Sequence, residues 1–220
     1  NGFPGTKDVK IEKKVHIIAG GYGVGKTSMA FKMASQIRNV HKQPASVISL
    51  GVNIDDNRAE LDIISTRLNV PNYFVKDVRG LEKVIDINGD NVYIIDIDTA
   101  SATEAIPFIR GQYREAQFHL VTPTDSCISS LRTNCELYKW DSIMFTRLDS
   151  PLVPWAAIEA LSEYRIPLSI GSTSSSLTTD LVRVSKENIS RRLIEFLNFN
   201  ISGPDNMRDS LEVTRINALH

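Results

Sequence analysis

The stretch from Val15 to Ala34 constrains the fold of this chain more than any other part of the sequence. A β-branched, apolar run at 15–19 is followed by Gly20-Gly21-Tyr22-Gly23-Val24-Gly25-Lys26-Thr27-Ser28 and by a helix-like segment. The motif that ends in Lys26-Thr27 matches G-x-x-x-x-G-K-[ST], in which glycines let backbone N–H groups point at a phosphate. A glycine-rich turn can match by chance, but a strand before and a helix after are the context that this pattern requires. We therefore expect residues 20–28 to bind a polyphosphate, with Lys26 on the β- and γ-phosphates and Thr27 on Mg²⁺.

Composition indicates a large globular domain. The chain has 220 residues, of which 42% are hydrophobic and 23% are charged, so one sizeable core can form. The net charge of −1 gives no reason to expect nucleic acid or acidic lipid as a general partner. No apolar run approaches the ~20 residues needed to cross a bilayer. Cys127 and Cys135 lack metal-ligand spacing and are expected to be reduced thiols, which favours a cytoplasmic location.

Strand-like and helix-like segments alternate from residue 15 to residue 200. Strands are expected at 15–19, 45–51, 73–75, 91–97, 118–121, 142–145 and 168–170. Helices are expected at 26–40, 58–68, 81–87, 104–111, 126–138, 156–164 and 188–199, with Pro107 interrupting the fourth. This alternation predicts an α/β fold of three layers, with a mostly parallel sheet between helices. Residues 1–14 form a polar lead-in that suggests a piece of something longer, and residues 201–220 form a tail or loose helix.

Acidic residues follow the apolar strand at 92–95. In P-loop proteins a carboxylate at this place holds Mg²⁺, usually through its water shell. Asp96 is the first acid beyond the apolar run and is the preferred candidate. Asp98 is the alternative, because residues two apart on an extended chain point the same way. A third reading is an acidic turn that only caps the next element.

A third motif, Thr146-Arg147-Leu148-Asp149, follows the strand at 142–145. A carboxylate in this place can accept hydrogen bonds from N1–H and N2–H₂ of guanine, and adenine offers no such pair of donors. Asp149 could therefore select GTP over ATP. The alternative is that Asp149 starts a turn before Pro151.

These three motifs, in this order and spacing, resemble the signal-recognition-particle (SRP) type of GTPase, a group of P-loop proteins of the SIMIBI class. The arrangement is most similar to the G domain of the flagellar-placement GTPase type called FlhF. Further similarity lies in Leu120-Val121-Thr122-Pro123-Thr124 and in the segment 155–171. The resemblance covers about residues 15–197 and implies the three-layer P-loop fold.

The resemblance also implies roles for the matching residues. Phosphate and Mg²⁺ would be bound by Lys26 and Thr27, and the magnesium water shell would be held by Asp96. The base would lie against two loops, whose residues are Thr146, Arg147, Asp149, Gly171 and Ser172. The family normally has lysine where this chain has Arg147, and a guanidinium plane can also stack on a base.

Two family motifs are altered in this chain. Where the family has Asp-Thr-x-Arg, a gapless alignment gives Gly51-Val52-Asn53-Ile54, and a four-residue slip gives Asp55-Asp56-Asn57-Arg58. Where the family has Asp-Thr-Ala-Gly-Arg, this chain has Asp96-Ile97-Asp98-Thr99-Ala100-Ser101, with no glycine and no arginine. The missing glycine normally senses the γ-phosphate through its N–H, so switching and hydrolysis are affected. Arg58 is the best candidate for a catalytic charge facing the γ-phosphate.

Three functions are compatible with these residues. The first is a GTP–Mg²⁺-binding protein that hydrolyses GTP weakly, or on forming a homodimer or heterodimer. By resemblance it would act in protein targeting, or in placing a membrane-associated machine such as a flagellum, pilus or secretion system, from the cytoplasm or from the inner face of the membrane. The second is a degenerate member of the family that acts as a scaffold or assembly protein. The third is an ATPase in which Asp149 is only structural.

Overall fold

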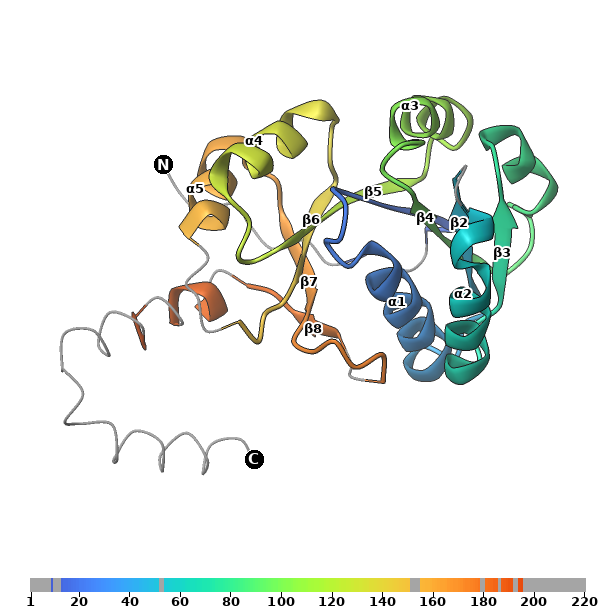
Figure 1. Ribbon diagram of the computed structural model, residues 1–220, viewed down its shortest axis with the longest axis horizontal. Helices are drawn as coiled ribbons and strands as arrows, with labels where there is room; N and C mark the ends of the chain where they lie inside the picture. The colour runs from blue at the N-terminus through green and yellow to red at the C-terminus, as the bar shows by residue number, and fades with distance from the viewer. Residues whose placement is uncertain are drawn as a thin grey trace.

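An eight-stranded sheet forms the centre of the protein, in the order β3-β2-β4-β1-β5-β6-β7-β8 (Figure 1). The computed structural model describes residues 9, 13–51, 54–150, 155–178, 181–185, 187–191 and 194–195. The strands are β1 (Val15–Ala19), β2 (Ala45–Leu50), β3 (Asn72–Val75), β4 (Val92–Ile97), β5 (Gln117–Pro123), β6 (Ser142–Thr146), β7 (Leu168–Ser172) and β8 (Leu181–Arg183). The pairs are parallel except for β7 with β8, which is antiparallel. The mostly parallel sheet expected from the sequence is confirmed.

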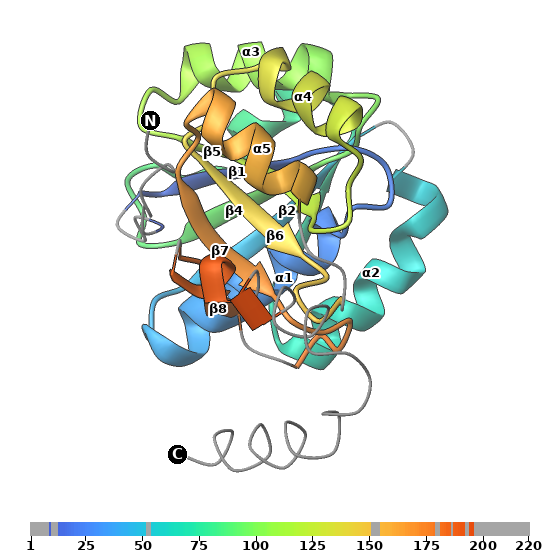
Figure 2. The same cartoon turned by 90° about the vertical axis from the view of Figure 1, so that its left-hand side faces the viewer.

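Helices cover both faces of the sheet, which gives three layers (Figure 2). Helices α1 (Lys26–Val40) and α2 (Ile54–Leu68) lie on one face, and α3 (Ala102–Gln112), α4 (Ile128–Leu137) and α5 (Trp155–Tyr164) lie on the other. Successive strand residues point to opposite faces, so Ile17 packs in the core beneath α3 to α5 while Ile18 packs in the core beneath α1. Because both faces are buried, most residues of the central strands are apolar, and apolar residues do not alternate with exposed polar ones.

Strand β1 lies between β4 and β5, and the loop that follows it therefore lies at the middle of the sheet. In open parallel sheets, ligands bind outside the carboxyl ends of the strands, where the chain connections diverge to either side. The register pairs Ile18 with Asp96 and Ala19 with Leu120. The segment 20–25, the acids after β4 and the hydroxyl residues after β5 are thus brought to one edge.

The structure differs from the sequence-based expectations in a few elements. The helix expected at 81–87 is a 3₁₀-helix, η1 (Val78–Lys83), because the Asp77 carboxylate accepts from the N–H groups of Arg79 and Gly80 and starts the turn earlier. Pro107 does not interrupt α3, which continues from Ala102 to Gln112 with Pro107 on its exposed side. Strand β8 was not expected. Of the proposed lead-in only residues 9, 13 and 14 are described, and the tail at 201–220 lies outside the described residues.

Candidate functional site: a phosphate-binding loop and an adjoining base-side loop

The loop between β1 and α1 needs glycine at its last turn. Gly25 is the N-cap of α1 and has a φ of 90°, in the left-handed region that favours glycine. A Cβ atom there would also lie 3.1 Å from Cγ2 of Thr146. The hydroxyl group of Thr146 donates a 2.7 Å hydrogen bond to the carbonyl oxygen of Val24. The end of β6 therefore holds the phosphate loop in place from the side.

The ammonium group of Lys26 lies against this loop. Its Nζ donates to the carbonyl oxygen of Gly21 at 2.7 Å, to Oγ1 of Thr99 at 3.1 Å and to the carbonyl oxygen of Gly20 at 3.2 Å. Burial lowers the pKa of Lys26, and the carboxylates of Asp96 and Asp98 oppose that shift. The charge of Lys26 is thus partly desolvated, which strengthens its attraction for a bound anion, while the two nearby carboxylates oppose that attraction.

Thr27 and Asp96 meet between α1 and β4. The Thr27 hydroxyl group donates a 2.6 Å hydrogen bond to Oδ2 of Asp96. Asp96 is buried, and its Oδ1 has no hydrogen-bond partner among the described residues. Burial raises the pKa of Asp96, while the hydrogen bond from Thr27 and the charge of Lys26 act to lower it. A buried carboxylate oxygen without a partner, beside a threonine hydroxyl group, fits Mg²⁺ and its water shell.

No group of three or more His, Cys, Asp or Glu side chains in the described part of the chain could hold a metal ion. A magnesium site does not require such a group, because Mg²⁺ usually keeps several waters and is bound by one or two protein groups together with phosphates. Thr27 and Asp96 are the residues that would hold it, and Asp98 is close to both Asp96 and Lys26.

A cavity of about 440 Å³ opens over the phosphate loop. Lys26, Thr27, Asp96 and Asp98 all line it, so the structure brings the predicted phosphate and metal residues together. Helix α2 contributes Asn57 and Glu60 to the same wall, and Thr99 and Ala100 close it after β4. Neither Glu60 nor Thr99 was assigned a role from the sequence. Glu60 belongs to no motif and α2 reaches the cavity only through tertiary packing, while Thr99 was named only as part of the altered motif after β4.

Arg58 is not among the residues that line this cavity. Its guanidinium carbon lies 4.6 Å from the centre of the Phe74 ring, in a cation–π contact with β3. Asn57 and Glu60, its neighbours on α2, face the cavity instead. The structure therefore does not bring Arg58 to Lys26 and Asp96 in this conformation.

The residues expected to contact the base lie together at the ends of β6 and β7. The N–H of Leu148 donates a 3.0 Å hydrogen bond to the carbonyl oxygen of Ser172, which joins the two loops. Gly171 has no room for a side chain, since a Cβ would lie 2.8 Å from the Phe145 carbonyl oxygen and 2.4 Å from Cδ1 of Leu148. Asp149 is exposed at this junction. An exposed carboxylate on a tightly packed loop can accept donors from a ligand at little cost in desolvation.

Lys32 fixes the second of these loops to α1. Its Nζ is buried and donates to Oγ of Ser172 at 2.6 Å and to the carbonyl oxygen of Ser174 at 2.7 Å. Burial lowers the pKa of Lys32, and the nearby carboxylate of Asp149 opposes the shift. The motif reading missed Lys32, although it lies six residues beyond Lys26 on the same helix.

Arg147 forms an ion pair beside the base-side loop. Its φ is 56°, and its guanidinium Nη1 lies 3.3 Å from Oδ2 of Asp125. This exposed ion pair contributes little to stability and can open for a ligand. The structure places Arg147 beside the base-side loop, turned toward the segment that follows β5.

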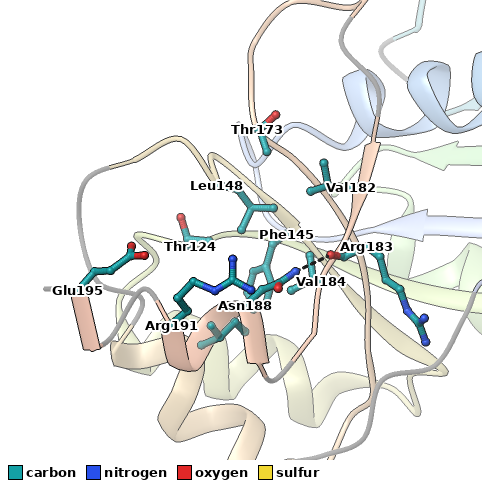
Figure 3. Close-up of a pocket in the computed structure, with 11 residues that line it drawn as sticks. Thr124, Phe145, Leu148, Thr173, Val182, Arg183, Val184, Asn188, Arg191 and Glu195 are labelled. Carbon is teal, nitrogen blue, oxygen red and sulfur yellow. Dashed lines mark hydrogen bonds between the residues drawn. The ribbon is translucent and has the colours of Figure 1, made fainter. Parts of the chain in front are cut away.

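A second cavity of about 330 Å³ lies on the other side of the Leu148 loop (Figure 3). Leu148, Phe145 and Val184 give it an apolar wall, and no residue of the segment 20–28 lines it. Asn188 borders it and donates a 3.3 Å hydrogen bond to the carbonyl oxygen of Arg183, the contact drawn in Figure 3. The predicted phosphate and metal residues that line a cavity lie in the first one, and they are Tyr22, Gly23, Lys26, Thr27, Asp96 and Asp98.

Comparisons with known proteins were made for sequence and for structure. No protein-family model matches the sequence, and no curated protein matches it. The crystal structure of FlhF complexed with GTP/Mg²⁺ matches with a TM-score of 0.71 at 14% identity, over 87% of this chain and 78% of that chain. FlhF complexed with GMPPNP/Mg²⁺ matches with a TM-score of 0.72 over the same shares. The fold is that of the SRP-type GTPases.

Two further structures support this assignment of the fold. The signal recognition particle receptor FtsY from Elizabethkingia anophelis has a TM-score of 0.65 at 16% identity, over 82% of this chain and 65% of that chain. The 54 kDa signal recognition particle protein from Aeropyrum pernix K1, in complex with GDP, has a TM-score of 0.63 at 15% identity, over 82% of this chain and 48% of that chain. The three-layer P-loop fold expected from the motifs is confirmed.

Proposed function

We propose that this chain binds a guanine nucleotide with Mg²⁺ at the phosphate loop. The observation that carries the proposal is the contact between Thr27 and Asp96, which leaves one buried carboxylate oxygen without a partner beside Lys26. A folded protein keeps such a group where a ligand uses it, because an unpartnered buried charge is destabilising. Neighbours of the same fold are complexed with GTP/Mg²⁺, GMPPNP/Mg²⁺ and GDP, which supports this ligand class.

Each part of the site has a role in this proposal. The backbone N–H groups of residues 20–28 and the ammonium group of Lys26 bind the phosphates. Thr27 and Asp96 hold Mg²⁺, with Asp98 as the alternative to Asp96. When bound, Mg²⁺ neutralises phosphate charge. The base lies against the loops that Leu148 and Ser172 join, where Asp149 accepts from guanine and Thr146, Arg147 and Gly171 complete the wall.

Hydrolysis in this proposal is weak or depends on a partner. The glycine that would sense the γ-phosphate is replaced, and the catalytic candidates are Asp96 and Arg58. Arg58 reaches the cavity only if its guanidinium group leaves Phe74. A dimer or another partner that moves α2 would therefore complete the site.

The cellular role that we propose is targeting, or placement of a membrane-associated machine, by a protein that works in the cytoplasm or peripherally at the inner face of the membrane. It rests on the resemblance to FlhF and FtsY. Among the described residues, no helix combines the length and apolar character needed to span a membrane. A scaffold with little or no hydrolysis is the second candidate, favoured by the missing glycine that would sense the γ-phosphate and opposed by the intact Lys26 and Thr27. In an ATPase, the remaining alternative, Asp149 would have no part in choosing the base.

A titration with GTP, GDP, ATP and ADP in the presence of Mg²⁺ tests the proposal. A ligand that binds only the folded state raises the melting temperature as its concentration exceeds the Kd. We expect GTP or GDP, and neither adenine nucleotide, to stabilise the protein, and Lys26→Ala to remove the effect. Lys83→Ala, a change of the same kind at an exposed position on η1, is the control. Stabilisation by no nucleotide favours the scaffold, and equal stabilisation by ATP and GTP rejects the guanine role of Asp149.

A further inference from the structure

The carboxylate of Asp98 occupies space that a side chain at residue 51 would need. A Cβ atom at Gly51 would lie 2.1 Å from Oδ2 of Asp98. The backbone N–H of Asp98 donates to the carbonyl oxygen of Leu50 at 3.0 Å, and Oδ1 accepts from the N–H of Ser101 at 2.6 Å. The carboxylate is therefore fixed between the ends of β2 and β4, on the wall of the phosphate cavity.

Thr99, the next residue, contacts the ammonium group that should bind phosphate. Its Oγ1 accepts from Nζ of Lys26 at 3.1 Å and lies 3.2 Å from the carbonyl oxygen of Gly20, to which it donates. Together with the carbonyl oxygens of Gly20 and Gly21, this hydroxyl group gives Lys26 three acceptors. An ammonium group has three N–H donors, so all of them are used within the protein.

These contacts of Lys26 should oppose binding of the γ-phosphate more than binding of the α- and β-phosphates. The P-loop lysine is the side chain that reaches the β- and γ-phosphates, while the α- and β-phosphates are also held by backbone N–H groups. A γ-phosphate brings additional negative charge into a cavity that Asp98 and Glu60 already line beside Asp96. Repulsion between like charges grows as their separation and the local dielectric constant fall. A diphosphate avoids the larger part of this repulsion.

We propose that Asp98 and Thr99 stand where a γ-phosphate would approach Lys26, so that the site selects a nucleoside diphosphate over a triphosphate. The inference rests on the proposed nucleotide binding and names the form of nucleotide that is bound. Gly51 contributes to this selection, because any larger residue at position 51 would displace the Asp98 carboxylate. Asp98 is then a specificity-determining residue rather than a metal ligand.

Isothermal titration of the full chain with GDP and with GMPPNP, both with Mg²⁺, tests this selection without hydrolysis during the measurement. We expect the Kd for GDP to be lower than that for GMPPNP by ~10-fold or more, and Asp98→Asn to reduce this ratio by ~10-fold. The asparagine keeps the size of the side chain and an acceptor for Ser101. Asp90→Asn removes the same charge from a side chain that is 96% exposed on the loop before β4, and it should leave the ratio unchanged.

The sign of the change decides between the possible roles of Asp98. A loss of GMPPNP affinity in Asp98→Asn would make this residue a magnesium ligand and would overturn the inference. Equal wild-type affinities for the two nucleotides would also overturn it while leaving the proposed function intact, whereas binding of neither nucleotide would reject both. Thr99→Ala frees one donor of Lys26 and should shift the ratio in the same direction, so it provides the test if Asp98→Asn does not fold.

Discussion

The hydroxyl group of Thr27 lies 2.6 Å from Oδ2 of Asp96, across the boundary between the first helix and the fourth strand. Parallel pairing of β1 with β4 brings these residues together, since Ile18 is in register with Asp96 and Thr27 follows at the start of α1. The contact orients the carboxylate but satisfies only one of its two oxygens. In the proposed metal site, the protein thus bears the cost of desolvating the Asp96 carboxylate.

Asp96→Asn should stabilise the ligand-free protein and abolish magnesium-dependent binding. Burial raises the pKa of Asp96 above its ordinary value of 3.8, so the ionised form is less favourable in the folded than in the unfolded state. This group favours folding below that value, and the advantage is lost as the pH rises through the folded pKa. At about pH 7 a neutral asparagine should therefore add about 1–2 kcal/mol to the free energy of unfolding, or roughly 2–8 °C in melting temperature.

Thermal melts in EDTA measure this effect, and the gain should shrink toward about pH 4 as Asp96 itself becomes protonated. Thr27→Val is a companion variant that removes the hydroxyl donor and leaves the carboxylate without that bond. Thr27→Val should lower the melting temperature, whereas Asp96→Asn should raise it. A lower melting temperature for Asp96→Asn at neutral pH would contradict the assignment of Asp96 as a desolvated ligand group.

Lys32→Met should loosen the loop after β7. The ammonium group of Lys32 is buried and supplies donors to Oγ of Ser172 and to the carbonyl oxygen of Ser174. Methionine keeps the apolar stem but removes the donor, so the Ser174 carbonyl keeps only the hydroxyl group of Ser172 as a partner, which should cost about 1–3 kcal/mol in the free energy of unfolding. Urea denaturation measures the loss, with the exposed Lys83→Met as control. An unchanged midpoint of urea unfolding would show that the hydrogen bonds from Lys32 are not needed for stability.

The sequence predicted the parts of this fold that short-range chemistry determines. The strand at Val15–Ala19 and the helix at Lys26–Val40 have the expected bounds, because the phosphate-loop motif itself requires a strand, a glycine turn and a helix in that order. The buried parallel strands were recognisable as continuous apolar runs. The 3₁₀-helix at Val78–Lys83 was predicted at 81–87 instead, because a single side-chain cap at Asp77 decides where the helix starts.

Contacts that depend on register between distant strands could not be predicted. His16 and His119 are scattered in the sequence, yet their rings stack and their nitrogens lie 3.1 Å apart in the interior. The contact of Asp98 with Gly51 could not be predicted for the same reason, because the end of β2 lies beside β4 only after the sheet has formed. Residues within a motif could be predicted from the sequence, whereas the residues that surround the motif in space could be identified only from the fold.

Asp149→Asn should remove the preference for guanine over adenine. In the proposed complex the carboxylate would accept from two donors on the guanine edge, whereas an amide offers only one acceptor and adds a donor. We expect the ratio of the Kd for ADP to that for GDP to fall by at least ~100-fold. Asp149 is exposed, so stability should change little. Competition binding with both diphosphates measures the ratio, with the exposed Asp62→Asn as a charge control, and a ratio that stays high would place guanine recognition elsewhere.

Arg58→Ala should lower turnover with little effect on nucleotide affinity, if Arg58 is the catalytic charge. Its guanidinium group rests on Phe74, a contact worth only ~0.5–1 kcal/mol at a partly exposed site, so it can leave for the cavity at small cost. Phe74→Leu removes the aromatic ring that Arg58 contacts and should not lower turnover. Arg58→Ala should reduce turnover by at least ~10-fold. Single-turnover hydrolysis alongside a separate Kd measurement distinguishes the two effects. Equal losses of turnover and affinity, or no loss at all, would leave Arg58 as a structural partner of Phe74.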